Sequence, residues 1–410
     1  MAPMKPRDPR RLPVEVQRLQ QNLAERPAGR DFDVQPRWNA TNTEVEYFYR
    51  SSQLICDAAD LDEVLQAFDQ IPGGRPGVAD GPVGMKILDV GDRDAADLAD
   101  DLARMLGEGV VTPNHVLNAE GHSSVCPATE PVPWLGPVAD LPEPVGRGRP
   151  RIAVVDTGYS KDIAADSGYV RFSAVDGRSQ PDDEVFASGS DIRPYGGHGT
   201  AAAAVLLSVS GADSVRVHVR DCMVGGGVDE ITIVEDLQAV IDDGVDIISI
   251  QAGTYTRAGR TPKAFDAFYR KILSKRQDIV LLAAAGNEGS DDPFWPAAYG
   301  WCTAVGGLTR GGDSRASWTN YGHWVDVYAT GENIVVPYPN GKYKYVDGSS
   351  ADFTNAHALW SGTSFATPAV AGMVARRMIE RNVKADAARD IVLTDAAINA
   401  LPTTGPRVLV

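Results

Sequence analysis

The stretch Arg151-Ile-Ala-Val-Val-Asp156-Thr-Gly158 is a short apolar run that ends in an aspartate, a threonine and a glycine. A continuous Ile/Val run of this kind predicts a strand that is buried on both faces of a parallel sheet. Similar runs recur downstream and alternate with segments of helical apolar spacing: strands at 215–219, 247–250 and 279–285, helices at 231–241 and 264–273. This alternation predicts an α/β domain over 151–410 with a mostly parallel, buried sheet.

Asp156 is the first candidate functional residue, because functional groups in such sheets gather at the carboxyl ends of the strands. A carboxylate there can accept the Nδ1 proton of a histidine, which fixes the ring tautomer and stabilises the imidazolium. An aspartate before a glycine is also typical of an ordinary turn. Its function therefore depends on a histidine elsewhere in the chain.

His198 is the candidate partner and lies in the motif Gly196-Gly-His198-Gly-Thr200, directly before an alanine-rich run. The alanines predict a helix, so the histidine is expected at or near a helix start. A near-neutral imidazole can remove a hydroxyl proton and return it to a leaving amine. The alternative is a structural histidine that caps the helix.

Ser364 is the candidate nucleophile, in the motif Ser361-Gly-Thr-Ser364-Phe-Ala-Thr-Pro368-Ala-Val-Ala-Gly372. The small-residue turn and the early proline predict the start of a helix. Backbone N–H groups and the helix dipole at such a start stabilise a developing negative charge. The alternative is a helix-capping serine without chemistry.

Asn287 follows a further apolar run, in Leu281-Leu-Ala-Ala-Ala-Gly-Asn287-Glu-Gly289. Its side-chain amide can donate a hydrogen bond to a tetrahedral oxyanion, beside the backbone N–H of Ser364. A turn asparagine in a left-handed conformation is the alternative.

The four motifs, in this order and with these flanking residues, resemble the subtilisin family (subtilases) over residues 151 to about 395. The resemblance implies a subtilisin-like three-layer fold and a serine endopeptidase that hydrolyses polypeptides through an acyl-enzyme on Ser364. Asp156, His198 and Ser364 would form its catalytic triad, and Asn287 its oxyanion hole. No organic cofactor is expected, no metal site is predicted, and no dependable calcium-loop signature is present.

The resemblance also implies where substrate binds. A strand and glycine turn would pair with the substrate backbone, and the residues after Asn287 would border the pocket for the side chain that precedes the cleaved bond. The predicted substrate-binding residues are Ile250, Gln251, Ala252, Gly253, Glu288 and Phe294. Glu288, with Asp291 and Asp292, would favour a basic side chain in that pocket, although a solvated acidic loop is the favoured interpretation of the three.

Three features depart from the family pattern. Ala201 stands where a second histidine is usual, and Ala369 replaces the common histidine after the proline of the serine motif. Neither residue takes part in breaking the peptide bond, so activity is still expected. The insertion 342–359 is unusual and is interpreted as a flap near the site.

Residues 45–120 predict a small α/β unit of two strand–helix pairs and a last strand, which suggests a ferredoxin-like sandwich. Residues 1–44 predict a flexible arm, and the proline-rich residues 121–150 predict a linker without regular structure. Many subtilases carry a small propeptide that blocks the cleft until it is cleaved off. The unit is therefore interpreted either as such an inhibitory, zymogen-type domain, cleaved within 118–150, or as a permanent accessory domain.

Composition narrows the class of protein. The chain has 410 residues, 43% of them hydrophobic, and a formal net charge of −16. Such acidity disfavours nucleic acid or an anionic membrane as a partner. No apolar run is long enough to span a membrane, and no signal-like segment is present, so a cytoplasmic location is expected.

The cysteines Cys56, Cys126, Cys222 and Cys302 are widely spaced and lack metal-binding patterns. They are expected to be reduced thiols. A Cys56–Cys126 disulfide is the alternative.

Two other functions compete with the peptidase. One is a catalytically silent subtilase fold that binds peptides or serves as a scaffold. The other is a sedolisin-like acid peptidase, which shares the serine motif but uses an acidic pair and an oxyanion aspartate. His198 and Asn287 argue against the second.

Overall fold

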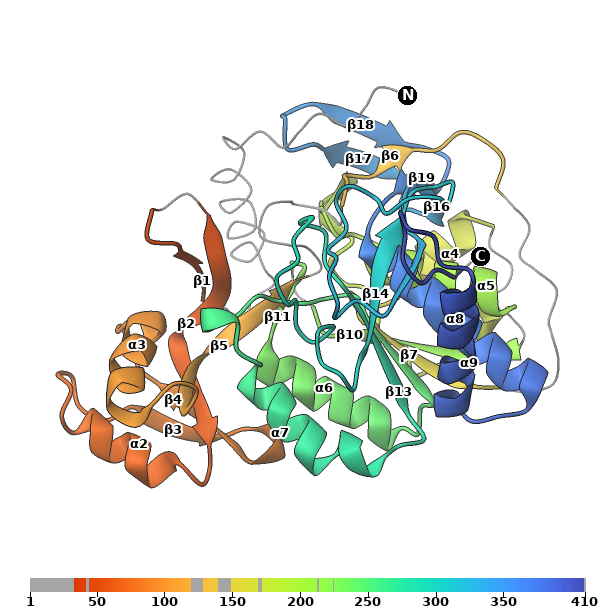
Figure 1. Ribbon diagram of the computed structural model, residues 1–410. Helices are drawn as coiled ribbons and strands as arrows, with labels where there is room; N and C mark the ends of the chain where they lie inside the picture. The colour runs from red at the N-terminus through yellow and green to blue at the C-terminus, as the bar shows by residue number, and fades with distance from the viewer. Residues whose placement is uncertain are drawn as a thin grey trace.

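A computed structural model describes residues 33–41, 44–118, 128–138, 149–168, 172–211, 214–223 and 225–408. They form a small α/β unit at the N-terminal side and a larger α/β domain beside it (Figure 1). The flexible arm predicted over residues 1–44 extends too far, because β1 (Val34–Trp38) pairs antiparallel with β2 (Val45–Asp57). The part of the arm at residues 1–32 lies outside the described residues.

The small unit has the strand order of a ferredoxin-like sandwich. Along the chain β2 is followed by α2 (Leu61–Phe68), β3 (Gly77–Asp80), β4 (Met85–Asp89), α3 (Ala95–Leu106) and β5 (Val111–Asn118). In the sheet the order is β5-β2-β4-β3, and the described neighbours are antiparallel. Apolar residues of the two helices and the sheet, including Leu54, Phe68, Leu98 and Leu102, form a core belonging to this unit alone.

The larger domain is built on a parallel sheet of order β10-β7-β12-β13-β14-β15. The strands are β7 (Arg151–Asp156), β10 (Arg216–Asp221), β12 (Ile247–Ile250), β13 (Val280–Ala284), β14 (Thr303–Leu308) and β15 (Val327–Thr330). The apolar runs of the sequence thus fall on strands as predicted.

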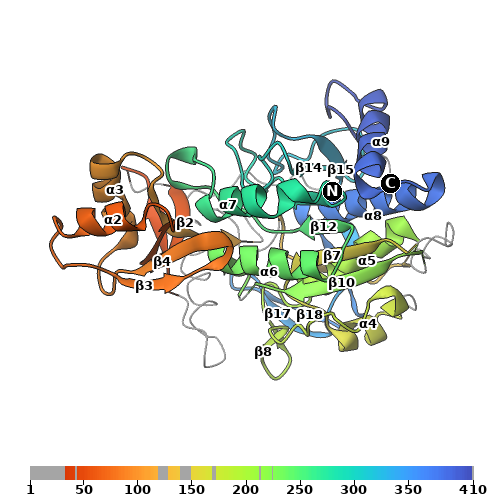
Figure 2. The ribbon, with the colours of Figure 1, turned by 90° about the horizontal axis from the view of Figure 1, so that it is seen from below.

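Helices cover both faces of this sheet (Figure 2). Ala153 and Val155 of β7 pack toward the core that contains α6 (Glu230–Asp242) and α7 (Lys263–Lys271). Ile152 and Val154 pack toward α5 (His198–Ser210), α8 (Thr363–Arg381) and α9 (Ala385–Ile398). Side chains alternate across a strand, so a continuous apolar run supplies both cores. The short helix α4 (Lys161–Asp166) follows β7.

Two small sheets lie beside the start of α8. One has the order β16-β19-β6, from β16 (Ile334–Pro337), β19 (His357–Trp360) and β6 (Val132–Pro133). The other has the order β18-β17-β9-β8, from β8 (Phe186–Ser188), β9 (Asp191–Ile192), β17 (Gly341–Lys344) and β18 (Ser350–Phe353). The predicted insertion is therefore the β17–β18 hairpin and β19. The presence of β6 corrects the expectation that 121–150 has no regular structure: proline is tolerated at the edge of a sheet.

The three cysteines within the described residues, Cys56, Cys222 and Cys302, are buried and free. Burial raises the pKa of the Cys56 thiol to about 11 and those of Cys222 and Cys302 well above the ordinary value. Cys126 lies outside the described residues, and the free state of Cys56 contradicts the alternative of a disulfide between them. In the part of the chain that the structure describes, no helix has the length and apolarity needed to cross a membrane.

Candidate active site

Asp156 and His198 meet at the carboxyl end of β7. His198 is the first residue of α5, after Gly197 with φ 82°, a left-handed backbone that glycine adopts without strain. The Nδ1 atom of His198 lies 2.8 Å and 2.9 Å from the two carboxylate oxygens of Asp156. Both side chains are fully buried. An ionised carboxylate only accepts hydrogen bonds, so Nδ1 carries the proton and Nε2 is the basic nitrogen.

Ser364 lies in the first turn of α8, after Gly362. Its Oγ atom and the Nε2 atom of His198 are both buried, and neither has a hydrogen-bond partner among the described residues. The next residue, Phe365, packs its ring 5.4 Å from the His198 ring, which places the start of α8 against the histidine. Two unpaired buried polar atoms are unusual in a folded protein. Nucleophile–base hydrogen bonds are often long in ligand-free sites and shorten when substrate binds.

Asn287 is joined to the residue directly before the serine. Its Oδ1 atom accepts hydrogen bonds from the backbone N–H of Thr363 at 2.9 Å and from the Thr363 hydroxyl at 3.0 Å. The Thr363 hydroxyl in turn accepts from the N–H of Gly286 at 3.2 Å. The amide oxygen therefore faces Thr363, and the amide nitrogen is the end directed away from it.

Four of the predicted substrate-binding residues lie at the end of β12. Ile250, Gln251 and Ala252 are buried, and the Gln251 side chain bonds back to Ser249. Gly253 differs, because both its backbone N–H and its carbonyl are hydrogen-bonded to Asn118 of the small unit, at 3.0 and 2.9 Å.

Phe294 lies beside Gly253, and Glu288 is connected to it through Tyr255. A Cβ atom on Gly253 would come within 2.1 Å of the Phe294 ring, so this contact requires glycine. Tyr255 joins the group: its ring packs 5.1 Å from Phe294, and its hydroxyl bonds to the Glu288 carboxylate at 3.3 Å. Asn320 donates to the same carboxylate oxygen at 3.1 Å.

The acidic residues Glu288, Asp291 and Asp292 differ in their surroundings. Burial, together with the Glu288 carboxylate, raises the pKa of the Tyr255 hydroxyl, which therefore stays protonated and donates. Asp291 and Asp292 are exposed to solvent. The interpretation as a solvated acidic loop thus suits these two residues, whereas Glu288 is held inside a hydrogen-bond network.

The profile of the Subtilase family matches residues 148–405. This chain belongs to the subtilase family. Subtilases are serine endopeptidases, so the protein is a hydrolase of this class.

Individual relatives match this chain at low sequence identity. The intracellular serine protease of Paenibacillus polymyxa is 29% identical over 277 residues, which are 64% of this chain and 75% of that protein. The thermophilic serine proteinase of Bacillus sp. (strain AK1) is 30% identical over 240 residues, which are 56% of this chain and 52% of that protein.

Solved structures show the same fold. The structure of fervidolysin from Fervidobacterium pennivorans, described as a keratinolytic enzyme related to subtilisin, superposes with a TM-score of 0.57 at 15% identity. The superposition covers 88% of this chain and 60% of that one. At this identity the likeness shows the fold alone.

Asp182 is a buried residue of this subtilase that the sequence analysis missed. Its Oδ2 atom accepts a hydrogen bond from the backbone N–H of Gly197, at 2.9 Å, and one from the hydroxyl of Thr157, at 3.3 Å. The Thr157 hydroxyl also accepts from the N–H of Gly199, at 3.1 Å. Asp182 thereby joins the loop after Asp156 to the residues on both sides of the histidine.

Burial shifts the ionisation equilibrium of the Asp182 carboxyl group. Burial, opposed by its backbone hydrogen bonds and reinforced by the nearby Asp156 carboxylate, raises the pKa of Asp182 to about 7. Nothing in the sequence distinguishes this residue from its exposed neighbour Asp183, because only the fold shows which of two adjacent carboxylates points inward.

Trp360 is the second missed residue, although its place directly before Ser361 was a usable signal. Its fully buried indole packs edge-on against the His198 ring, with centroids 5.3 Å apart and an interplanar angle of 84°. It also packs 5.4 Å from Phe365. The histidine therefore contacts a carboxylate through Nδ1 and two aromatic rings through its sides.

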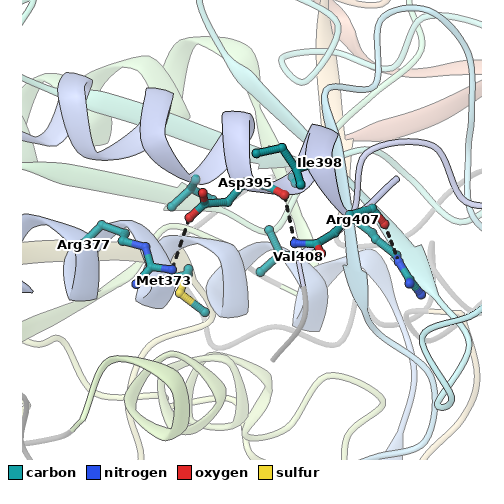
Figure 3. A pocket seen from close by; sticks show the side chains of 9 residues that line it. Met373, Arg377, Asp395, Ile398, Arg407 and Val408 are labelled. Carbon is teal, nitrogen blue, oxygen red and sulfur yellow. Dashed lines mark hydrogen bonds and ion pairs between the residues drawn. The ribbon is translucent and has the colours of Figure 1, made fainter. Parts of the chain in front are cut away.

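A pocket of about 150 Å³ lies away from these residues, between α8, α9 and the segment before the C-terminus. Figure 3 shows its lining, which includes Met373, Ile398 and the ion pair of Arg377 with Asp395 at 3.2 Å. None of the candidate catalytic residues lines it. Among the described residues, no group of His, Cys, Asp and Glu is arranged to hold a metal ion.

Proposed function

We propose that this subtilase hydrolyses peptide bonds through an acyl-enzyme on Ser364. The Nε2 atom of His198 takes the Ser364 hydroxyl proton as Oγ attacks the carbonyl carbon, and Asp156 stabilises the imidazolium that forms. The amide of Asn287 and the backbone N–H of Ser364 stabilise the oxyanion. His198 then gives the proton to the leaving amine, and a water molecule, activated by the same nitrogen, releases the acyl group.

The observation that carries this proposal is the fixed geometry on both sides of the serine. The buried hydrogen bond between Asp156 and His198 leaves Nε2 as a base. The bond between Asn287 and Thr363 places an amide next to the nucleophile's turn. That catalysis needs no cofactor stays a prediction.

The proposal is tested with a fluorophosphonate probe, which labels only an activated serine. The chain should be labelled and should digest casein near neutral pH, and Ser364→Ala should do neither. Ser274→Ala, a half-buried serine on another element, is the matched control and should behave as wild type. An unlabelled wild-type chain would support the silent scaffold, and an acidic optimum would support a sedolisin-like enzyme.

We further propose that the unit at residues 34–118 inhibits the peptidase until it is removed. The supporting contact is at Gly253, whose backbone groups were predicted to pair with substrate by β-augmentation. Asn118, the last residue of β5, bonds to both of these groups. A chain segment bound there competes directly with a polypeptide substrate.

Buried polar contacts hold the unit in this place. The strand β11 (Gly227–Asp229) of the peptidase domain pairs with β5 and extends the sheet of the unit. His115 bonds through its backbone N–H and its Nδ1 atom to Glu230, at 3.3 and 2.9 Å. Arg50 and Asn114 bond to Asp229.

Charge complementarity adds to the contact. Arg257 of the peptidase domain pairs with Asp100 at 2.6 Å and with Glu108. Lys263 pairs with Asp57 at 3.1 Å. Cations of the peptidase domain thus face carboxylates of the unit along the interface. These pairs are partly buried at the edge of the interface, and they contribute specificity and salt dependence more than affinity.

This second proposal is tested on the full chain by following activity and N-terminal processing together. Activity should rise as intact chain disappears, and the isolated Ser364→Ala chain should stay intact. Constant activity while the chain stays intact would favour a permanent accessory domain.

We also propose that the enzyme acts inside the cell. One supporting observation is that a relative matched over most of this domain is named an intracellular serine protease. Fractionation of cells that produce the chain, with a tag at its C-terminus, tests the proposal, and recovery from the medium would contradict it.

A further inference from the structure

Residues 128–138, which we call the strap, bind along the strand that leads to the nucleophile's turn. The strand β6 pairs antiparallel with β19, with Val132 opposite Leu359. At one end of the strap, the N–H of Ala128 donates to the carbonyl of Ser361 at 2.8 Å. Toward the other end, the N–H of Trp134 donates to the carbonyl of His357 at 3.1 Å. The strap therefore lies along β19 up to three residues from Ser364 (Figure 1).

A second group of contacts ties the strap to the β17–β18 hairpin. The Glu130 carboxylate accepts hydrogen bonds from the N–H of Val346, at 3.0 Å, and from the Tyr343 hydroxyl, at 3.3 Å. The Tyr345 hydroxyl donates to the carbonyl of Pro131 at 3.0 Å. These contacts, like those to β19, all reach residues 343–361. The insertion, which the sequence analysis interpreted as a flap, and the linker thus form one structure.

The strap also controls Trp360. The indole N–H of Trp360 donates to the carbonyl of Thr129 at 2.8 Å, and the same indole packs edge-on against His198. A buried indole N–H needs a partner, so this carbonyl fixes the orientation of the ring. The ring in turn limits how the imidazole can rotate about its bond to Asp156.

We propose that Trp360 is a positioning residue for His198, and that the strap, by holding Trp360, is a permanent part of the peptidase. This inference rests on the proposed removal of the N-terminal unit. It implies that the cut removes only residues upstream of 128. Removal of the strap would leave the Trp360 N–H without its acceptor. The ring that packs against His198 would then no longer be held in one orientation. The rate of catalysis should then fall, whereas substrate binding should change little, because the contacts of Trp360 are with His198, Phe365 and the strap and not with the predicted substrate-binding residues.

The test compares four variants of the full chain. Trp360→Phe keeps an aromatic ring and loses the N–H. Glu130→Ala removes a strap anchor remote from the catalytic residues, and Glu130→Gln restores an acceptor oxygen of the same size. Leu135→Ala changes an exposed residue of the strap, 77% accessible, as the control. Rates are expressed per active serine, titrated with the fluorophosphonate, and the N-terminus of the active form is read by mass spectrometry.

Trp360→Phe and Glu130→Ala are expected to lower kcat about 10-fold, with KM within about twofold of wild type, because small misplacements of a catalytic group are costly. Glu130→Gln and Leu135→Ala should match wild type, and the active form should begin at or before residue 128. If Trp360→Phe does not fold, as judged by its thermal unfolding, the two Glu130 variants decide the proposal.

Three results would overturn the inference. Unchanged kcat in Glu130→Ala would show that the strap does not act on His198. A raised KM at constant kcat in Trp360→Phe would show that this residue contacts substrate instead. An active form that begins after residue 138 would show that the strap is dispensable. Absence of labelling in the wild-type chain is a different result, since it contradicts the proposed catalysis itself.

Discussion

The two segments that precede the peptidase domain are bound to it in different ways. The unit at 34–118 has its own core, which includes Phe68 and Leu102. It meets the domain through one strand pairing, buried polar contacts, ion pairs and the apolar side chains of Ile55, Met85 and Leu117, which pack into the core of the domain. The strap has no core of its own, and neutral backbone groups provide most of its contacts. A unit with its own core can stay folded after it separates from the domain, whereas a segment that is ordered only by its neighbour loses its structure. This contrast suggests a removable unit and a permanent strap around one catalytic site.

The largest expected effect tests whether the site itself is independent of both segments. Asn287→Ala should lower kcat by about 10²–10³, because one oxyanion donor is lost. The factor should be the same for the low residual activity of the intact chain and for the form that has shed the unit at 34–118. Steady-state kinetics per titrated serine measure it. A different factor in the two forms would mean that the unit takes part in building the oxyanion hole.

A smaller effect concerns the frame around His198 and depends on pH. The pKa of Asp182 is raised from 3.8 to about 7, so between these pH values the folded protein binds a proton that the unfolded chain has released. Stability should therefore fall as pH rises through this window and be constant on either side of it. Relative to Asp182→Asn, the wild type should lose on the order of 2 kcal/mol from pH 4 to 7.

Urea unfolding at several pH values measures this difference. Asp183→Asn, at the exposed neighbour, is the control and should keep the wild-type slope. Parallel pH dependences for wild type and Asp182→Asn would contradict the assignment.

The buried part of the interface with the unit should matter next. Glu230 is fully buried and accepts hydrogen bonds from His115 and from the N–H of Ala264. Glu230→Ala leaves these donors unsatisfied and should cost about 1–3 kcal/mol of unfolding free energy. It should also speed release of the unit in limited proteolysis. Glu235→Ala, exposed on the same helix, should do neither.

The smallest expected effect is on the charged rim. Arg257→Ala removes the pairs with Asp100 and Glu108 and should weaken the contact by about 0.2–1 kcal/mol. Release of the unit from wild type should quicken with added salt, and this dependence should decrease in the variant because fewer charges remain to be screened. Arg276→Ala, whose partner Asp278 is adjacent in the chain, is the control. Equal salt dependence in all three would mean that ion pairs do not hold the unit.

Much of the fold followed from local patterns. The apolar runs at 152–155, 215–219 and 247–250 fall on β7, β10 and β12, because a buried parallel strand needs apolar side chains on both faces. The ferredoxin-like sandwich of the small unit also followed from its two strand–helix pairs, although the edge strand β3 was missed. The extent of the arm and the lack of structure in the linker were predicted wrongly. β1 and β6 are short edge strands that leave no periodic signal, and the partner of β6, β19, is also remote in sequence.

The candidate site divides in the same way. Asp156, His198, Asn287 and Ser364 stand out because their flanking glycines and small residues form recognisable motifs, and the structure joins Asp156 to His198 and Asn287 to Thr363. Their catalytic roles stay predictions. Asp182 has no motif, and the contact of Gly253 with Asn118 joins residues that no local pattern relates.

The sequence by itself determined the family, the order of the chemical groups and the parallel sheet that carries them, since these depend on residue type and short-range spacing. Only the tertiary structure decided which of the carboxylates of Asp182 and Asp183 is buried, which strand end lies on Gly253 and which carbonyl holds Trp360. The physical reason is that burial and pairing depend on which distant segments exclude water together, and local composition does not encode that choice.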